Sequence, residues 1–223
     1  MTRRKRDQYL QNTTAENVIE NGKPLYKTIK GQWHTHQFKN NNPIVLELAC
    51  GKGEYTVGLA REYPGCNFIG VDIKGDRIAW GSQEALRDRL KNVAFLRADI
   101  QYLREFFGSN EVDEIWVTFP DPQPRDKQEK HRLTHPRFLE IYADLLLPGG
   151  LFHLKTDHAP FFDFSLETLS AFGFTDLLYT HNLYASPMND IHHGIKTKYE
   201  VMFFEKGFSI NYLQCKNKTA LTI

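Results

Sequence analysis

Short apolar runs rich in β-branched residues recur along the middle of the chain and alternate with segments of helical spacing. Apolar residues such as Phe138, Ile141 and Leu145 fall three to four positions apart, which is typical of one helix face. Near-continuous apolar strands separated by helices predict a parallel sheet that is covered on both faces. The sequence therefore predicts an α/β, doubly wound fold, with strands at residues 44–50, 67–73, 93–99, 114–120 and 151–157.

The C-terminal part departs from this alternation. Residues 174–184 and 198–207 both have the composition of strands, and only a polar loop lies between them. A short connection joins antiparallel strands, whereas parallel strands need a long crossover. We expect a mostly parallel sheet with a terminal antiparallel strand pair.

The first 42 residues are polar and end in three Asn that precede Pro43, a cluster that favours turns. The whole chain carries a formal net charge of +1, yet residues 1–40 contain eight Lys or Arg and only three Asp or Glu. A chain of 223 residues with 41% hydrophobic positions can bury one sizeable core. The expected organisation is a basic, flexible and irregular N-terminal arm (1–42), one domain (43–213) and a C-terminal tail (214–223).

The sequence does not indicate a metal site, a disulfide framework or a membrane span. The three cysteines show no CxxC or Cys/His spacing, and neither His34/His36 nor His192/His193 has the i,i+4 spacing of a helical metal site. No apolar run approaches the ~18 residues of a membrane span, and the basic N-terminus lacks the apolar stretch of a signal peptide. We expect a soluble, cytoplasmic protein with no metal and no membrane partner.

A glycine-containing loop follows the first predicted strand and leads into a helix. Glu47 opens this loop, and Gly51 and Gly53 would let backbone N–H groups approach a ligand closely. The dinucleotide-binding pattern requires a third glycine where Thr56 stands. The loop is therefore a candidate ligand site of a different kind, or simply a tight turn.

Acidic residues end the next two predicted strands. Asp72 is placed to accept both ribose hydroxyls of an adenosine, while Asp99 and Ile100 are placed to bind the adenine amino group and cover its ring. Either carboxylate could instead cap the following helix. Acidic residues at three successive strand ends favour a cofactor that contains a nucleoside, and the absence of a GxxxxGK[ST] motif argues against a P-loop site.

A proline-rich loop follows the fourth predicted strand. Three prolines in residues 119–124 stiffen the backbone around Asp121. A dense basic stretch comes next and could contact phosphates, or could be a solvated surface loop; it contains Arg125, Lys127, Lys130, His131 and Arg132.

These motifs together resemble one family. The runs ELACGKGEY, GVDI, RADI, FPDPxP, HRL, PGG, KTD and TKYE, in this order over residues 44–213, are similar to those of the bacterial tRNA (guanine-N7)-methyltransferases, which have the class I methyltransferase fold. The resemblance implies methyl transfer from S-adenosyl-L-methionine to N7 of a variable-loop guanosine (position 46) in tRNA. It implies cofactor binding by Glu47, Asp72, Asp99 and Asp121, and places at the guanosine Arg125, Asp157, Thr197, Lys198, Tyr199 and Glu200.

Guanine N7 has an exposed lone pair and no proton, so its methylation depends on positioning rather than on a strong base. The site needs carboxylates that accept from guanine N1–H and N2–H, and Asp121, Asp157 and Glu200 are candidates, the first two as catalytic residues. Alternatively, Asp157 caps the next helix, and Glu200 pairs with Lys198 or another neighbour.

The chain departs from the family pattern at three positions, where Ala49, Gln123 and Gln128 replace the usual Gly, Trp and His. Two other functions stay open. One is a class I methyltransferase for a small molecule, although a neutral metabolite would not need the basic stretch and the basic arm. The other is a non-catalytic RNA-binding relative, which only Gln123 and Gln128 favour. The sequence also leaves open whether the protein is a monomer or a homodimer.

Overall fold

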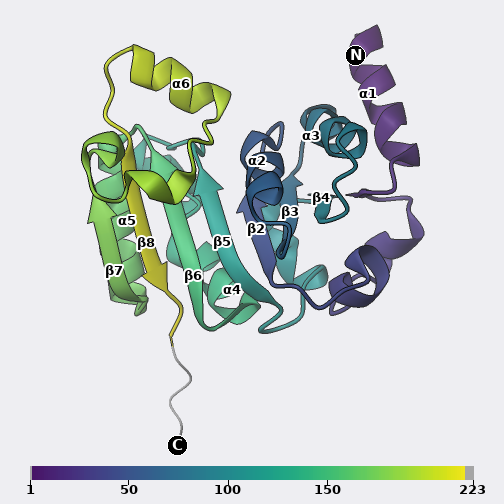
Figure 1. Cartoon of the computed structure of the whole chain (residues 1–223). Coiled ribbons are helices and arrows are strands. Elements are labelled where there is room, and N and C mark those ends of the chain that lie inside the picture. Colours follow the sequence, from purple (N-terminus) through teal and green to yellow (C-terminus); the bar gives the residue numbers. More distant parts are fainter. Residues whose placement is uncertain (1, 219–223) are drawn as a thin grey trace, which may run out of the picture.

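A computed structural model describes residues 2–218 of the chain. These residues form an eight-stranded sheet in the order β1-β4-β3-β2-β5-β6-β8-β7 (Figure 1). All neighbouring strands are parallel except β8, which is antiparallel to both β6 and β7. The predicted α/β class and mostly parallel sheet are confirmed. The strands are β1 (Val18–Ile19), β2 (Ile44–Leu48), β3 (Asn67–Asp72), β4 (Val93–Arg97), β5 (Val112–Thr118), β6 (Leu146–Thr156), β7 (Thr175–Thr180) and β8 (Asn211–Lys216).

Helices cover both faces of this sheet (Figure 1). The α-helices are α1 (Arg3–Thr14), α2 (Glu54–Glu62), α3 (Gly75–Arg87), α4 (Pro136–Leu145), α5 (Ala159–Phe172) and α6 (Lys198–Glu205). Leu46 and Leu48 pack into the core on the side of α4 and α5, whereas Val45 packs into the core beneath α2. Alternate strand residues therefore supply two separate cores, which explains why the central parallel strands are apolar at most positions. Short helical segments occupy Pro24–Lys27, Trp33–Phe38, Ile100–Glu105, Asp126–His131, Leu183–Ala185 and Asn189–His192.

The prediction that residues 1–42 are irregular is wrong for the part that the structure describes. β1 adds to the edge of the sheet beside β4, and Asn12 in α1 donates to the carbonyl of Gly75 at 2.7 Å. Trp33 is completely buried, stacks on Phe107 with ring centroids 5.1 Å apart, and donates to the carbonyl of Phe106 at 2.9 Å. The segment has no helical or alternating periodicity because its few apolar residues contact distant parts of the chain.

The antiparallel pair exists, but one of its members was assigned wrongly. Residues 198–205 form α6, and the partner of β7 is β8, which inserts between β6 and β7. Thr197 and Glu200 form a capping box at the start of α6, a T-x-x-E signature that strand composition obscured. Residues 214–216 of the expected C-terminal tail belong to β8, and residues 219–223 of that tail lie outside the described residues.

Candidate active site

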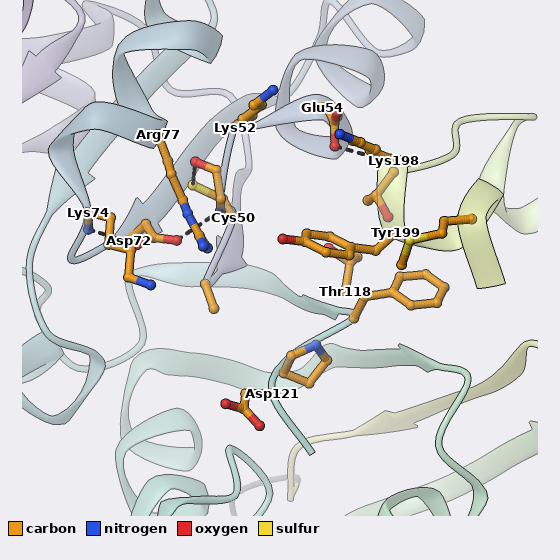
Figure 2. A pocket seen from close by; sticks show the side chains of 16 residues that line it. Cys50, Lys52, Glu54, Asp72, Lys74, Arg77, Thr118, Asp121, Lys198 and Tyr199 are labelled. Carbon is orange, nitrogen blue, oxygen red and sulfur yellow. Dashed lines mark hydrogen bonds between the residues drawn. The ribbon is translucent and has the colours of Figure 1, made fainter. Parts of the chain in front are cut away.

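A cavity of about 430 Å³ opens at the carboxyl ends of β2, β3 and β5. This is the point where the strand order reverses, with β3 on one side of β2 and β5 on the other, and open α/β sheets bind their ligands there. The loop after β2, the loop after β5 and the first turn of α6 form its walls (Figure 2). Six of the residues predicted from the sequence line it: Gly51, Asp72, Asp121, Thr197, Lys198 and Tyr199.

The loop between β2 and α2 follows a tight path that requires small residues. Ala49, Gly51 and Gly53 all have positive φ angles, of 56°, 57° and 72°. A Cβ atom at Gly53 would lie 2.5 Å from the ring of Phe95, so only glycine fits there. At Gly51 a Cβ would meet nothing within 4 Å, which leaves the backbone beside the cavity open to a ligand.

Glu47 lies beneath this loop rather than in the cavity wall. Its side chain is buried, and Oε1 accepts a hydrogen bond from the Thr118 hydroxyl at 2.6 Å. Oε2 accepts from the backbone N–H of Thr56 at 2.8 Å and also from the Thr56 hydroxyl. Burial raises the pKa of the Glu47 carboxyl to about 7, although these donors oppose the increase. Glu47 thus joins β2, α2 and β5 and positions the loop between them.

Asp72 faces the cavity from the end of β3. Oδ2 accepts from the backbone N–H of Gly51 at 2.9 Å, and Oδ1 accepts from that of Lys74 at 2.8 Å. A carboxylate has about four acceptor positions, so Asp72 keeps capacity for two further donors. The side chains of Lys74 and Arg77 reach the same cavity (Figure 2). Both cations were missed from the sequence because the start of a surface helix gives no signal of what it faces.

Asp99 and Ile100 lie outside the cavity wall. Asp99 caps the helical segment 100–105, where its carboxylate accepts from the backbone N–H of Gln101 at 3.0 Å and from the Gln101 side chain at 2.9 Å. The structure thus realises the capping alternative at this strand end.

Asp121 is exposed at the rim of the cavity, and its carboxylate accepts from the backbone N–H of Gln123 at 3.2 Å. Arg132 is mostly buried, with its guanidinium 4.5 Å from the ring centre of Phe164, and its Nε donates to the Gln123 carbonyl at 3.3 Å. It therefore anchors the proline-rich loop. By contrast, Arg125 and Lys130 are exposed on the adjoining segment.

Asp157 is half-buried at the end of β6, and burial raises the pKa of its carboxyl. It does not cap α5, because His158 takes that position and accepts from the backbone N–H of Phe161 at 3.1 Å. The helix-cap alternative for Asp157 is therefore wrong. Asp157 is not among the residues that line the cavity.

The first turn of α6 reaches across the cavity to α2. The backbone N–H of Lys198 donates to Oε2 of Glu54 at 3.1 Å, and the ring of Tyr199 points into the cavity (Figure 2). Glu200 points the other way, is completely buried and pairs with Lys155. The alternative that Glu200 pairs with Lys198 or another neighbour in sequence is wrong, because Lys155 lies 45 residues earlier in the chain.

A family model described as "Putative methyltransferase" matches residues 41–213. The tRNA (guanine-N(7)-)-methyltransferase of Cytophaga hutchinsonii is 44% identical over 216 residues, which span 96% of this chain and 97% of that protein. The chain belongs to the tRNA (guanine-N7)-methyltransferase family. The family member from Bacteroides fragilis is 47% identical over 186 residues, which span 83% of this chain and 73% of that protein.

The fold also matches solved methyltransferase structures outside the tRNA (guanine-N7)-methyltransferase family. The 16S rRNA methyltransferase KamB superposes with a TM-score of 0.63 at 16% identity, over 91% of this chain and 99% of that one. Within residues 2–218, no three His, Cys, Asp or Glu side chains gather in a group that could hold a metal ion. No helix in the same residues combines the length and apolar character needed to cross a membrane.

Proposed function

We propose that the protein transfers a methyl group from S-adenosyl-L-methionine to N7 of a variable-loop guanosine in tRNA. The observation that carries this proposal is the cavity at the strand-order reversal, in a chain whose relatives of 44% and 47% identity are named for that reaction. A methyltransferase for a neutral small molecule would not need the exposed cations beside this cavity.

The residues of the cavity suit S-adenosyl-L-methionine. Asp72 has spare acceptor capacity for a ribose diol, and the backbone at Gly51 is open to close approach. Lys74 and Arg77 supply positive charge for the amino-acid carboxylate of the cofactor. When bound, the cofactor supplies an electrophilic sulfonium methyl group.

Positioning of the guanosine falls to two carboxylates that follow the carboxyl ends of the neighbouring strands β5 and β6. Asp121 lies at the rim, and Asp157 follows at the end of the neighbouring strand β6. Ionised carboxylates there would accept from guanine N1–H and N2–H and hold the ring with N7 directed at the methyl group. Because N7 carries no proton, neither residue has to remove one.

The tRNA backbone would lie along the segment after the proline-rich loop. Arg125, Lys127 and Lys130 are exposed there, close in sequence to Asp121 at the cavity rim. Phosphate contacts of this kind supply affinity and register but no base specificity. Selection of the guanosine would therefore rest on the carboxylates.

The test is incubation of the purified protein with unmodified tRNA and methyl-labelled S-adenosyl-L-methionine, followed by digestion to nucleosides. Label should appear in 7-methylguanosine. The matched control is the same tRNA with adenosine in place of the variable-loop guanosine, which should stay unlabelled. Label in another nucleoside, or none in either tRNA, would refute the proposal.

A further inference from the structure

α6 is attached to the rest of the protein in an unusual way. A surface helix normally packs through an apolar stripe. In α6 the single buried residue is Glu200, whereas Tyr199, Val201 and Phe204 are exposed. In Figure 1, α6 stands beyond the carboxyl ends of the parallel strands, apart from the helical layers on the two sheet faces. Phe204 packs edge-on against Tyr184 with ring centroids 4.6 Å apart, but no apolar residue of α6 is buried. Burial of apolar surface therefore does little to determine where α6 lies.

The Glu200 carboxylate instead has a nearly complete set of polar partners. Lys155 Nζ lies 2.7 Å from Oε1 and 2.9 Å from Oε2, and the Tyr184 hydroxyl donates to Oε1 at 2.7 Å. The N–H of Thr197 is 3.4 Å from Oε2. Lys155 is itself completely buried, and its Nζ lies 5.0 Å from the ring centre of Tyr55 in α2. One ion pair thus connects β6, α2, the 183–185 segment and α6.

A buried ion pair contributes little net stability, because desolvation offsets the attraction, but it fixes a geometry when its hydrogen bonds are complete. The turn that Glu200 fixes includes Thr197, Lys198 and Tyr199, which line the cavity. We propose that Lys155 and Glu200 are positioning residues that hold the first turn of α6 as a wall of the cofactor cavity. This proposal rests on the proposed function and assigns Glu200 to that wall rather than to the guanosine.

The pair also joins the KTD and TKYE motifs of this chain. Lys155 is the first residue of KTD and Glu200 the last of TKYE. In the sheet, Lys155 is in register with Thr118 of β5, and Thr118 donates to Glu47 beneath the glycine loop. The wall formed by α6 and the wall formed by the loop are therefore fixed at adjacent strand positions.

The experiment compares Lys155→Met, Glu200→Gln and the double variant with wild type. The control is Glu205→Gln, which alters an exposed carboxylate on the same helix. Hydrogen–deuterium exchange of residues 197–206 is measured on the ligand-free protein, and S-adenosyl-L-methionine binding by calorimetry. Each single variant should exchange faster in this segment and bind the cofactor about tenfold more weakly, whereas Glu205→Gln should match wild type.

The double variant should bind S-adenosyl-L-methionine at least as tightly as the more impaired single variant, and residues 197–206 should exchange no faster in it. The reason is that it removes both charges instead of leaving one unpaired. Its melting temperature should be close to that of wild type, which a purely stabilising role would not allow. If a single variant does not fold, Tyr184→Phe, which removes one hydrogen bond from the same carboxylate, should still accelerate exchange in residues 197–206.

Unchanged exchange in Glu200→Gln or Tyr184→Phe, or additive effects in the double variant, would overturn the positioning role. Loss of turnover on tRNA with normal exchange and normal cofactor binding would instead place Glu200 at the guanosine. The exchange measurement needs neither cofactor nor tRNA, so a wild-type protein that failed to methylate tRNA would refute the proposed function and leave this result standing.

Discussion

Glu47 shows how one side chain can shape a ligand site that it does not line. Its carboxylate receives the Thr118 hydroxyl and both the backbone N–H and the hydroxyl of Thr56. Thr56 occupies the position at which a dinucleotide-binding loop has its third glycine, so the hydroxyl that breaks that pattern is also a donor to Glu47. The acidic start of the loop therefore has a structural role in this chain.

The pKa of Glu47 predicts a measurable pH dependence of stability. Because burial raises the folded pKa from 4.5 to about 7, the folded protein retains a proton that the unfolded chain releases between these values. The resulting stabilisation, about 3 kcal/mol in the free energy of unfolding, is complete below about pH 4.5 and is lost as pH rises through about 7. Urea unfolding at pH 5 and at pH 8 should therefore show that the free energy of unfolding falls more between these pH values in wild type than in Glu47→Gln. Parallel losses would contradict the raised pKa.

Asp72→Ala should weaken S-adenosyl-L-methionine binding by about 1.5 to 3 kcal/mol, because hydrogen bonds to a charged acceptor are removed. Calorimetry without tRNA measures this loss. Asp163→Ala, which removes an exposed carboxylate of α5, is the matched control and should bind as wild type does. Equal affinity in the two variants would exclude Asp72 from the cofactor site.

At the scale of elements, the cations of the short helix Asp126–His131 and of the residue after it have two different roles. Arg132 packs on Phe164 and anchors the proline-rich loop, whereas Lys127 and Lys130 stay exposed. A basic run in the sequence therefore does not say which cations are available to RNA, because only the packed structure shows which of them are engaged.

Replacing Lys127 and Lys130 with Ala should lower tRNA affinity and reduce the slope of log K against log salt by about 0.7 to 0.9 for each phosphate that the variant no longer neutralises. Filter binding over a range of salt concentrations measures both. Lys91→Ala is the control, since Lys91 is exposed just before β4 begins, at the end of the parallel strands opposite to the cavity. A double variant with the wild-type slope would show that this helix does not touch RNA.

At the scale of the whole molecule, the N-terminal segment is part of the fold. β1 extends the sheet beyond β4, and Trp33 fills the core on the side of α4 and α5. Near α1, the guanidinium of Arg97 lies 4.6 Å from the ring centre of Tyr9 and forms an ion pair with Glu20 at 3.1 Å. The segment therefore contributes to the stability of the sheet.

Trp33→Ala should lower the free energy of unfolding by about 3 to 5 kcal/mol, because it leaves a cavity and an unpaired carbonyl at Phe106. Urea unfolding measures the change. Tyr102→Ala, at a half-exposed aromatic residue, should cost much less. If Trp33→Ala lowers the free energy of unfolding only slightly, the N-terminal segment is an arm and not part of the fold.

The sequence alone determined what neighbouring residues encode. The apolar runs predicted the parallel strands, and Gly51, Gly53 and Asp72 marked the end of the sheet where the cavity lies. These predictions succeed because strand periodicity, tight turns and residues at strand ends are local properties, and a parallel sheet brings its carboxyl ends to one edge.

Only the tertiary structure decided what distant residues do together. Residues 198–207 have the composition of a strand, but a capping box starts the helix α6 there. The strand between β6 and β7 is instead β8. Lys155 meets Glu200 across 45 positions, and Trp33 meets Phe106 across 73. Such contacts leave no periodic pattern in the sequence, because their partners lie far apart along the chain. They form only when packing compensates the entropy lost in closing a long loop.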